Sequence, residues 1–197
     1  MAKIRKAVSY RRLERPYTRK SKYRQKNYVR ASPHNSIVKY VMGNVQKAYP
    51  LTLELTSDSN IQLRHNCIES ARKSAIKLLE EKLGKNFQFQ IRMFPHHVLR
   101  ENPLASGAGA DRMSTGMTQS FGKPIGIAAQ VRKGKVIMDL GIDEKDVAVG
   151  TLALKRAQYK FPMRCIIRVK APAKKTPVVA KKAAVKKTVK KAVVVEA

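Results

Sequence analysis

The sequence predicts an α+β fold built on a mixed or antiparallel sheet with two helices. Several short runs are β-rich or alternate between apolar and polar residues, as half-buried strands do. Two longer runs space their apolar residues as amphipathic helices do. Because strands and helices do not alternate regularly, a parallel α/β sheet is disfavoured. The 197 residues suffice for one domain of ordinary size with tails.

Two short strands are expected to open the folded part. Residues 37–42 and 51–56 are β-rich, and Gly43 and Pro50 separate them.

The first helix is expected to follow these strands. Polar residues 57–60 offer caps for its start, and the helix should run to about Leu83 and stop at Gly84. Its apolar residues form one buried stripe. The other faces should largely carry the basic side chains Arg64, His65, Arg72, Lys73 and Lys77.

Residues 86–93 alternate strictly and predict a half-buried strand that ends in 94–97. Its inward face would carry Phe87, Phe89, Ile91 and Met93. After a long loop, residues 125–131 and 135–140 flank Arg132-Lys133-Gly134 and predict a hairpin. A second helix is expected over about 143–159, because acids stand in its first turn and basic residues near its end. Residues 163–170 close the fold as a strand.

The composition divides the chain into three parts. We expect a basic RNA-binding arm over 1–35, an α+β domain over 36–170 with a loop at 101–124, and a low-complexity tail over 171–197. Residues 1–30 contain twelve Lys and Arg, one acid and four tyrosines. Basic side chains can neutralise phosphates while tyrosine rings stack on exposed bases.

Charge is the dominant feature of the chain. Its 42 Lys and Arg against 13 Asp and Glu give a formal net charge of +29, which points to a polyanionic partner. Nucleic acid is the leading candidate, and an anionic membrane surface is the alternative. No apolar run reaches the roughly 18 to 20 residues that span a bilayer, and the N-terminus lacks the apolar core of a secretory signal. We therefore expect an intracellular protein without a membrane partner.

The sequence offers no constellation for catalysis or for a cofactor. Cys67 and Cys165 lie far apart without a CxxC pair, so we expect buried or half-buried thiols and no metal site. The glycine-rich loop matches neither a P-loop nor a dinucleotide fingerprint. His96 and His97 have no accompanying set of carboxylates. We therefore expect no enzyme and no cofactor.

Three stretches resemble one family of ribosomal proteins. They are residues 91–124 (IRMFPHHVLRENPLASGAGADRMSTGMTQSFGKP), 11–29 (RRLERPYTRKSKYRQKNYV) and 61–75 (IQLRHNCIESARKSA). The family is the archaeal and eukaryotic L10e proteins of the large ribosomal subunit, counterparts of bacterial L16p. The resemblance covers about residues 1–170, and the lysine-rich tail departs from the usual pattern.

This resemblance implies a hammerhead-type α+β fold embedded in large-subunit rRNA near the 5S rRNA and the tRNA-binding cleft. It also implies that the long loop projects toward the peptidyl-transferase region and tRNA. Its partners would be rRNA, tRNA and other ribosomal proteins on the cytoplasmic ribosome, without a homo-oligomer.

The expected rRNA contacts fall into an arm group and a second group on the folded part. The arm group is Arg11, Arg12, Arg15, Tyr17, Arg19, Lys20, Lys22, Tyr23 and Arg24. The second group is Arg64, His65, Arg72, Arg92, His96, His97 and Arg100. The loop residues expected to face tRNA are Gly107, Gly109, Asp111, Arg112 and Ser114, where small residues allow close approach to phosphates. The alternatives are a transient assembly or regulatory factor and, more remotely, a small RNA-modifying enzyme.

Overall fold

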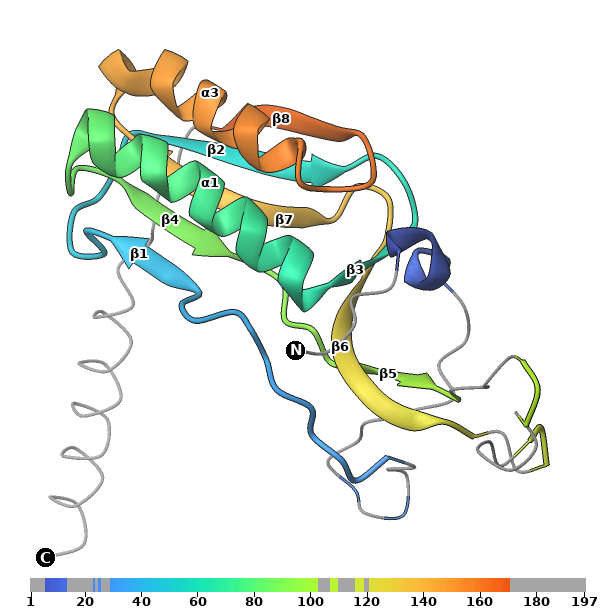
Figure 1. The fold of residues 1–197 in the computed structure, drawn as a ribbon. Coiled ribbons are helices and arrows are strands. Elements are labelled where there is room, and N and C mark those ends of the chain that lie inside the picture. The colour runs from blue at the N-terminus through green and yellow to red at the C-terminus, as the bar shows by residue number, and fades with distance from the viewer. Residues whose placement is uncertain are drawn as a thin grey trace, which may run out of the picture.

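Two antiparallel sheets joined at one corner form the frame of the molecule (Figure 1). The computed structural model describes residues 6–13, 23, 25, 29–102, 107–109, 116–118 and 121–170. Within these residues the chain forms eight strands and two α-helices, and every strand pairing is antiparallel. The predicted α+β class with two helices is therefore confirmed.

The larger sheet has five strands, and both α-helices cover one of its faces (Figure 1). In spatial order the strands are β1 (Val41–Gly43), β4 (Gln88–Ile91), β7 (Val136–Ile142), β2 (Leu51–Ser57) and β8 (Cys165–Lys170). The helices are α1 (His65–Leu83) and α3 (Val147–Gln158), which lie side by side. This helix-covered layer is the main body.

The core lies between the five-stranded sheet and the two helices. Leu53, Leu140 and Phe89 are neighbours across β2, β7 and β4, and each is fully buried. From the helices, Ile68 and Leu154 are equally buried against the same cluster. Each such side chain stabilises the fold by about 1.5–3 kcal/mol through burial of apolar surface.

The smaller sheet projects from the body and carries the start of the chain. Its strands in spatial order are β3 (Ile61–Arg64), β6 (Lys123–Val131) and β5 (His97–Glu101). The 3-10 helix η1 (Ala7–Tyr10) lies beside β3. In Figure 1, β6 curves away from the body toward the long loop.

The predicted hairpin of residues 125–140 is wrong, because β6 and β7 belong to different sheets. β2 continues into β3 while β6 continues into β7, so the two pairs form one long bent ribbon. At the bend, the Ser57 N–H donates to the Lys135 carbonyl at 3.0 Å, and the Gly134 N–H donates to the Ser57 carbonyl at 2.7 Å. The turn at 132–134 therefore carries the chain from one sheet to the other.

The predicted start of the first helix is also wrong. Ser57 ends β2, residues 58–60 connect it to β3, and α1 begins only at His65. The proposed capping side chains are used elsewhere, because the Ser57 hydroxyl donates to the Ser59 carbonyl and Asn60 Oδ1 accepts from the Lys133 N–H. The end is confirmed, since Gly84 has φ +61° and its N–H donates to the Glu80 carbonyl.

Other predicted elements are present with different bounds. Of the first expected strand, 37–42, only Val41 and Met42 pair in the sheet, where Gly43 extends β1. β5 covers residues 97–101, for which no strand was predicted. The second helix begins with a 3-10 turn, η3 (Glu144–Asp146), that holds two of the acids. The strand expected over 86–93 is confirmed as β4, with its predicted inward face buried.

Both cysteines are free thiols in partly or fully buried positions, as expected. Cys67 Sγ donates to the Lys160 carbonyl at 2.8 Å. Burial raises the pKa of each thiol to about 11, so both are protonated at neutral pH.

Candidate nucleic-acid interface

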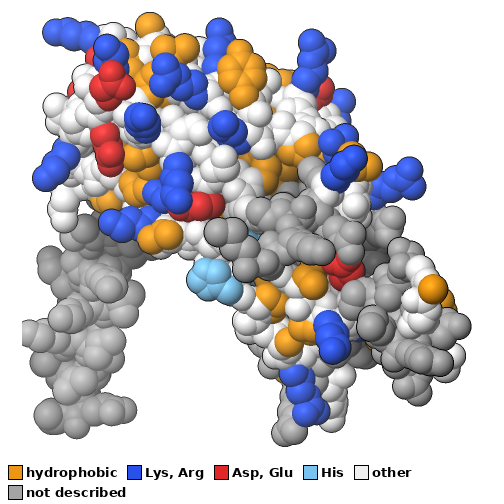
Figure 2. Space-filling model, in the orientation of Figure 1, with side chains coloured by type: hydrophobic (Ala, Val, Ile, Leu, Met, Phe, Trp, Pro, Cys, Tyr) orange, Lys and Arg blue, Asp and Glu red, His pale blue; other side chains and the backbone are white. Residues whose placement is uncertain are grey.

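The surface of the protein is strongly basic. Figure 2 shows lysine and arginine side chains spread over the body and the projecting sheet, with few acidic side chains among them. Some of the basic side chains are paired with carboxylates, as in Lys47–Asp143 and Lys170–Glu54. With 42 Lys and Arg against 13 Asp and Glu, most cations cannot have a carboxylate of their own. A polyanion would therefore meet positive charge on both parts of the molecule.

Residues 10 and 11 of the N-terminal arm are docked on the projecting sheet. The Gln62 N–H donates to the Arg11 carbonyl at 2.9 Å, and Gln62 Nε2 donates to the Tyr10 carbonyl at 3.0 Å. The Arg64 guanidinium lies 5.2 Å from the centre of the Tyr10 ring, a cation–π distance. These contacts leave Arg11 and Arg12 exposed at the surface.

The rest of the predicted arm group lies mostly outside the described residues. This applies to Arg15, Tyr17, Arg19, Lys20, Lys22 and Arg24. Tyr23 is described, and its side chain is exposed. The roles of these residues stay predictions.

At the start of α1, two predicted contact residues take part in the fold itself. Arg64 packs on Tyr10, and His65 Nδ1 accepts from the Ser36 N–H at 3.2 Å. Burial lowers the pKa of His65, and the nearby charges of Arg64 and His34 lower it further. His65 is therefore a neutral acceptor at pH 7, which ties the segment before β1 to the helix.

Arg72 lies in a buried ion pair, whereas the helical pattern predicted an exposed position. Its side chain is 12% exposed, and two guanidinium nitrogens donate to the Glu69 carboxylate at 2.6 and 2.8 Å. A third nitrogen contacts Met42 Sδ at 3.1 Å on β1. This position favours a structural role, and an rRNA contact by Arg72 stays a prediction.

Residues 92–96 connect β4 of the larger sheet to β5 of the smaller sheet. Arg92 and His96, both predicted contacts, are exposed there, and the exposed Phe94 ring lies between them. Arg92 Nε also donates to the Asp139 carboxylate. Sequence reasoning missed Phe94, although its place on the polar side of an alternating run was a readable signal.

On β5, His97 and Arg100 are half-buried and face β6. They pair in register with Ala128 and Pro124. Burial lowers the pKa of His97, which favours its neutral form. Both side chains are therefore less accessible than Arg92 and His96, and their rRNA contacts stay predictions.

One hydrogen bond and one close backbone approach at a glycine define the base of the long loop. Asn102 Nδ2 donates to the Gly116 carbonyl at 3.2 Å. Gly122 has φ +73°, and a Cβ there would lie 2.8 Å from the Glu101 carbonyl carbon, so only glycine fits this turn.

Within the loop, Gly107 and Gly109 are exposed and have positive φ. The predicted Asp111, Arg112 and Ser114 lie outside the described residues. Sequence reasoning also missed two apolar side chains of the loop, Met117 and Phe121, which are 66% and 69% exposed.

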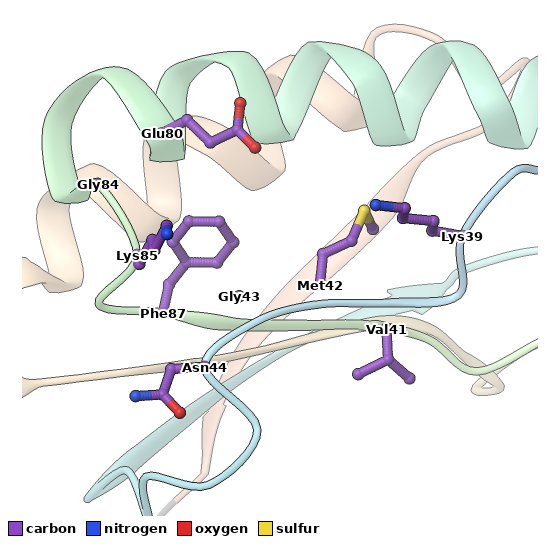
Figure 3. A pocket seen from close by; sticks show the side chains of 9 residues that line it. All are labelled: Lys39, Val41, Met42, Gly43, Asn44, Glu80, Gly84, Lys85 and Phe87. Atoms are coloured by element: carbon purple, nitrogen blue, oxygen red, sulfur yellow. The ribbon is translucent and has the colours of Figure 1, made fainter.

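A pocket of about 700 Å³ lies between the end of α1 and β1 (Figure 3). Figure 3 shows Met42 and Phe87 pointing from the strands toward α1, while Val41 points away. The charged residues around it are Lys39, Lys85 and Glu80. These groups include no nucleophile with a base and an orienting partner, so the pocket lacks the parts of a catalytic site.

Two other features are absent from the described residues. No group of three or more potential metal ligands occurs among them. Nor does any described helix combine the length and apolar character needed to cross a bilayer.

Comparison with known proteins identifies the family. The family model described as ribosomal protein L16p/L10e matches residues 14–168. Large ribosomal subunit protein uL16 of Methanococcus maripaludis is 42% identical over 167 residues, which cover 84% of this chain and 94% of that protein. Proteins of the same name from Archaeoglobus fulgidus and Staphylothermus marinus are 40% and 43% identical, over 79% and 75% of this chain and 87% and 82% of their own lengths. The chain thus belongs to the L16p/L10e family of ribosomal proteins.

Proposed function

We propose that this chain is a structural constituent of the large ribosomal subunit, where it binds rRNA and supports translation. One observation carries this proposal: the family match over residues 14–168, extended by relatives named for the large subunit that align over most of their length. Its place of work would be the ribosome in the cytoplasm, with rRNA and other ribosomal proteins as neighbours.

The physical properties of the chain support rRNA binding. A net charge of +29 on 197 residues repels itself, and surrounding phosphates would relieve that repulsion. Arg11, Arg12 and Arg92 are exposed on the docked arm and on the segment between the sheets. The arm group and the second group of the predicted contacts remain our candidates for phosphate binding and base stacking, although the Arg72 side chain is only 12% exposed.

Co-sedimentation tests this proposal against the alternative of a transient assembly or regulatory factor. A structural constituent should stay on large subunits at about one copy each through a high-salt wash, because buried interface area, which salt does not screen, holds it in addition to the salt-sensitive phosphate contacts. A transient factor would be stripped off. Quantitative mass spectrometry of washed subunits measures the copy number, and loss of the protein at high salt would refute the structural assignment.

We further propose that the long loop faces tRNA near the peptidyl-transferase centre, with the 5S rRNA in the neighbourhood of the protein. Exposed Gly107 and Gly109 allow close approach of backbone N–H groups to phosphates. Met117 and Phe121 offer exposed apolar surface at the same end of the molecule. The predicted Asp111, Arg112 and Ser114 complete this candidate tRNA-facing set.

Deletion of residues 105–115 tests the role of the loop. Subunit incorporation should remain, because the two sheets and the helix layer do not include these residues. Peptide synthesis that depends on tRNA should fall in subunits that carry the deletion. Failed incorporation, or incorporation with full peptide synthesis, would contradict the tRNA-facing role.

We also propose that the chain contributes no catalytic group. The described residues bring together no nucleophile, base and orienting group, and the family is one of ribosomal proteins.

A further inference from the structure

The segment 92–96 presents an unusual exposed face. Its residues alternate, with Met93 and Pro95 buried and Arg92, Phe94 and His96 exposed. The Phe94 and His96 rings are in contact with each other. A guanidinium, a phenyl ring and an imidazole therefore occupy successive exposed positions of this segment.

Three rings lie against one another at this place, with Tyr40 stacked on Phe94 and His96 tilted against it. The Phe94 ring lies 5.5 Å from the Tyr40 ring at an interplanar angle of 24° and 4.7 Å from the His96 ring at 47°. We call Tyr40, Phe94 and His96 the Phe94 ring stack.

The stack is held in place from the body. The Tyr40 hydroxyl accepts from Asn35 Nδ2 at 2.9 Å, and the Tyr40 carbonyl accepts from the Ile91 N–H at 2.8 Å. Tyr40 precedes β1 and Ile91 ends β4, so the rings are anchored to the five-stranded sheet. The protein therefore already fixes these side chains, so that a ligand would not have to bear the entropy loss of ordering them, as in a preorganised binding site.

Burial in the core does not explain this arrangement. Phe94 is 49% exposed although a phenyl ring gains from full burial. Two residues earlier in the chain, the Arg92 side chain is 54% exposed, and its Nε donates to the Asp139 carboxylate. An exposed, fixed ring next to a fixed cation suits a ligand with a flat aromatic part and a negative charge.

We propose that the Phe94 ring stack is a nucleobase-stacking site. An unpaired base of rRNA lies against the exposed ring surface, and the Arg92 guanidinium contacts a phosphate of the same strand. Base stacking on protein rings is tolerant of sequence and acts together with backbone neutralisation by cations. The inference rests on the proposed rRNA-binding function and names one site within it. Arg92 and the strong positive charge of the chain favour RNA over a protein partner.

Two probes of equal charge separate stacking from phosphate attraction. The full-length protein is titrated with a short oligoadenylate and with an abasic ribose-phosphate strand of the same length. We expect wild type to prefer the oligoadenylate, because only that strand can stack. In Phe94→Leu, binding of the oligoadenylate should weaken by about 5- to 100-fold, while binding of the abasic strand should change by less than about twofold, since no charge is lost.

Two further variants complete the design. Tyr159→Leu removes an aromatic ring that is 81% exposed on the end of α3, far from the stack in sequence, and should preserve both affinities. Phe94→Trp keeps an aromatic surface and should retain the preference for the oligoadenylate. Circular dichroism checks that each variant is folded.

The proposal is overturned if wild type shows no preference for the base-bearing strand, or if Phe94→Leu keeps that preference. In either case the ring stack would be a protein contact. Stable co-sedimentation with large subunits would still uphold the proposed function, so the two failures are distinguishable.

Discussion

Glu69 and Arg72 show how a charged pair can be part of the core of a basic protein. Their side chains are 8% and 12% exposed and meet at 2.6 Å. The hydrogen bond from Arg72 is the main cause that lowers the pKa of Glu69. Burying either charge alone would be costly, so each residue depends on the other.

We predict that Glu69→Gln lowers the free energy of unfolding by about 3–5 kcal/mol, because it leaves the Arg72 charge buried without its partner. Urea denaturation at pH 7 measures this loss. Since folding lowers the pKa of Glu69 from 4.5, the stabilisation by wild-type Glu69 is present above pH 4.5 and is lost as pH falls through the lowered pKa. The difference in the free energy of unfolding between wild type and Glu69→Gln should therefore become smaller as the pH falls below 4.5.

Lys73 provides the matched control for this pair. Its Nζ lies 3.7 Å from the same carboxylate, but its side chain is 69% exposed. Lys73→Ala should therefore change stability by no more than about 0.5 kcal/mol. Equal effects of the two substitutions would contradict the structural role of the Glu69–Arg72 pair.

At the scale of elements, the close approach of α3 to the sheet depends on a single glycine. A Cβ on Gly150 would lie 2.6 Å from Ile142 Cδ1 and 2.8 Å from Leu53 Cδ1. Both neighbours are fully buried and cannot move into solvent. The helix can lie this near to β7 and β2 only because position 150 has no side chain.

We predict that Gly150→Ala destabilises the protein, although alanine is the better helix former by about 1 kcal/mol. Overpacking a filled core costs about 1–3 kcal/mol, so the steric effect should dominate. Thermal unfolding followed by circular dichroism measures the change. A raised melting temperature would show that α3 moves off the sheet without cost.

Elements with local signals could be predicted from the sequence, and non-local pairings could not. The strict alternation of 86–93 identified β4 because the pattern lies within the strand itself. The hairpin at 125–140 failed because nothing within those residues shows that β6 pairs with β3 and β5. The start of α1 failed for the same reason, since β3 needs β6 as its partner.

The candidate site was predictable to a similar degree. Basic composition identified Arg11, Arg12 and Arg92, which are exposed. It misplaced Arg72, because the contact of Arg72 with Met42 depends on where β1 lies. The ring partnership of Tyr40 with Phe94 was also beyond the sequence, because 54 positions in the numbering separate the two residues.

At the scale of the whole molecule, charge is unevenly divided between the fold and the tail. Removal of residues 171–197 takes away eight lysines and one glutamate and leaves a net charge of +22. The remaining chain is therefore still strongly basic. This division lets the contribution of the tail be measured separately.

We predict that truncation after Lys170 preserves thermal stability and large-subunit incorporation. The salt dependence of RNA binding should become shallower, by about 0.7 to 0.9 in the slope of log K against log salt for each phosphate that the tail neutralises in wild type. A full-length variant with the eight tail lysines replaced by glutamine should match the truncation. A salt slope equal to that of wild type in both variants would show that the tail neutralises no phosphates.

The bent ribbon also has a mechanical consequence. β6 runs from the base of the long loop to the bend, and the chain then enters β7, the middle strand of the larger sheet. The two hydrogen bonds between Ser57 and residues 134 and 135 clamp that bend on its other strand. A displacement of the far end of β6 would therefore be passed along continuous, hydrogen-bonded strands to the centre of the larger sheet, because no long flexible loop separates β6 from β7. A partner bound at that end of β6 would thus also influence the orientation of the five-stranded sheet that α1 and α3 cover.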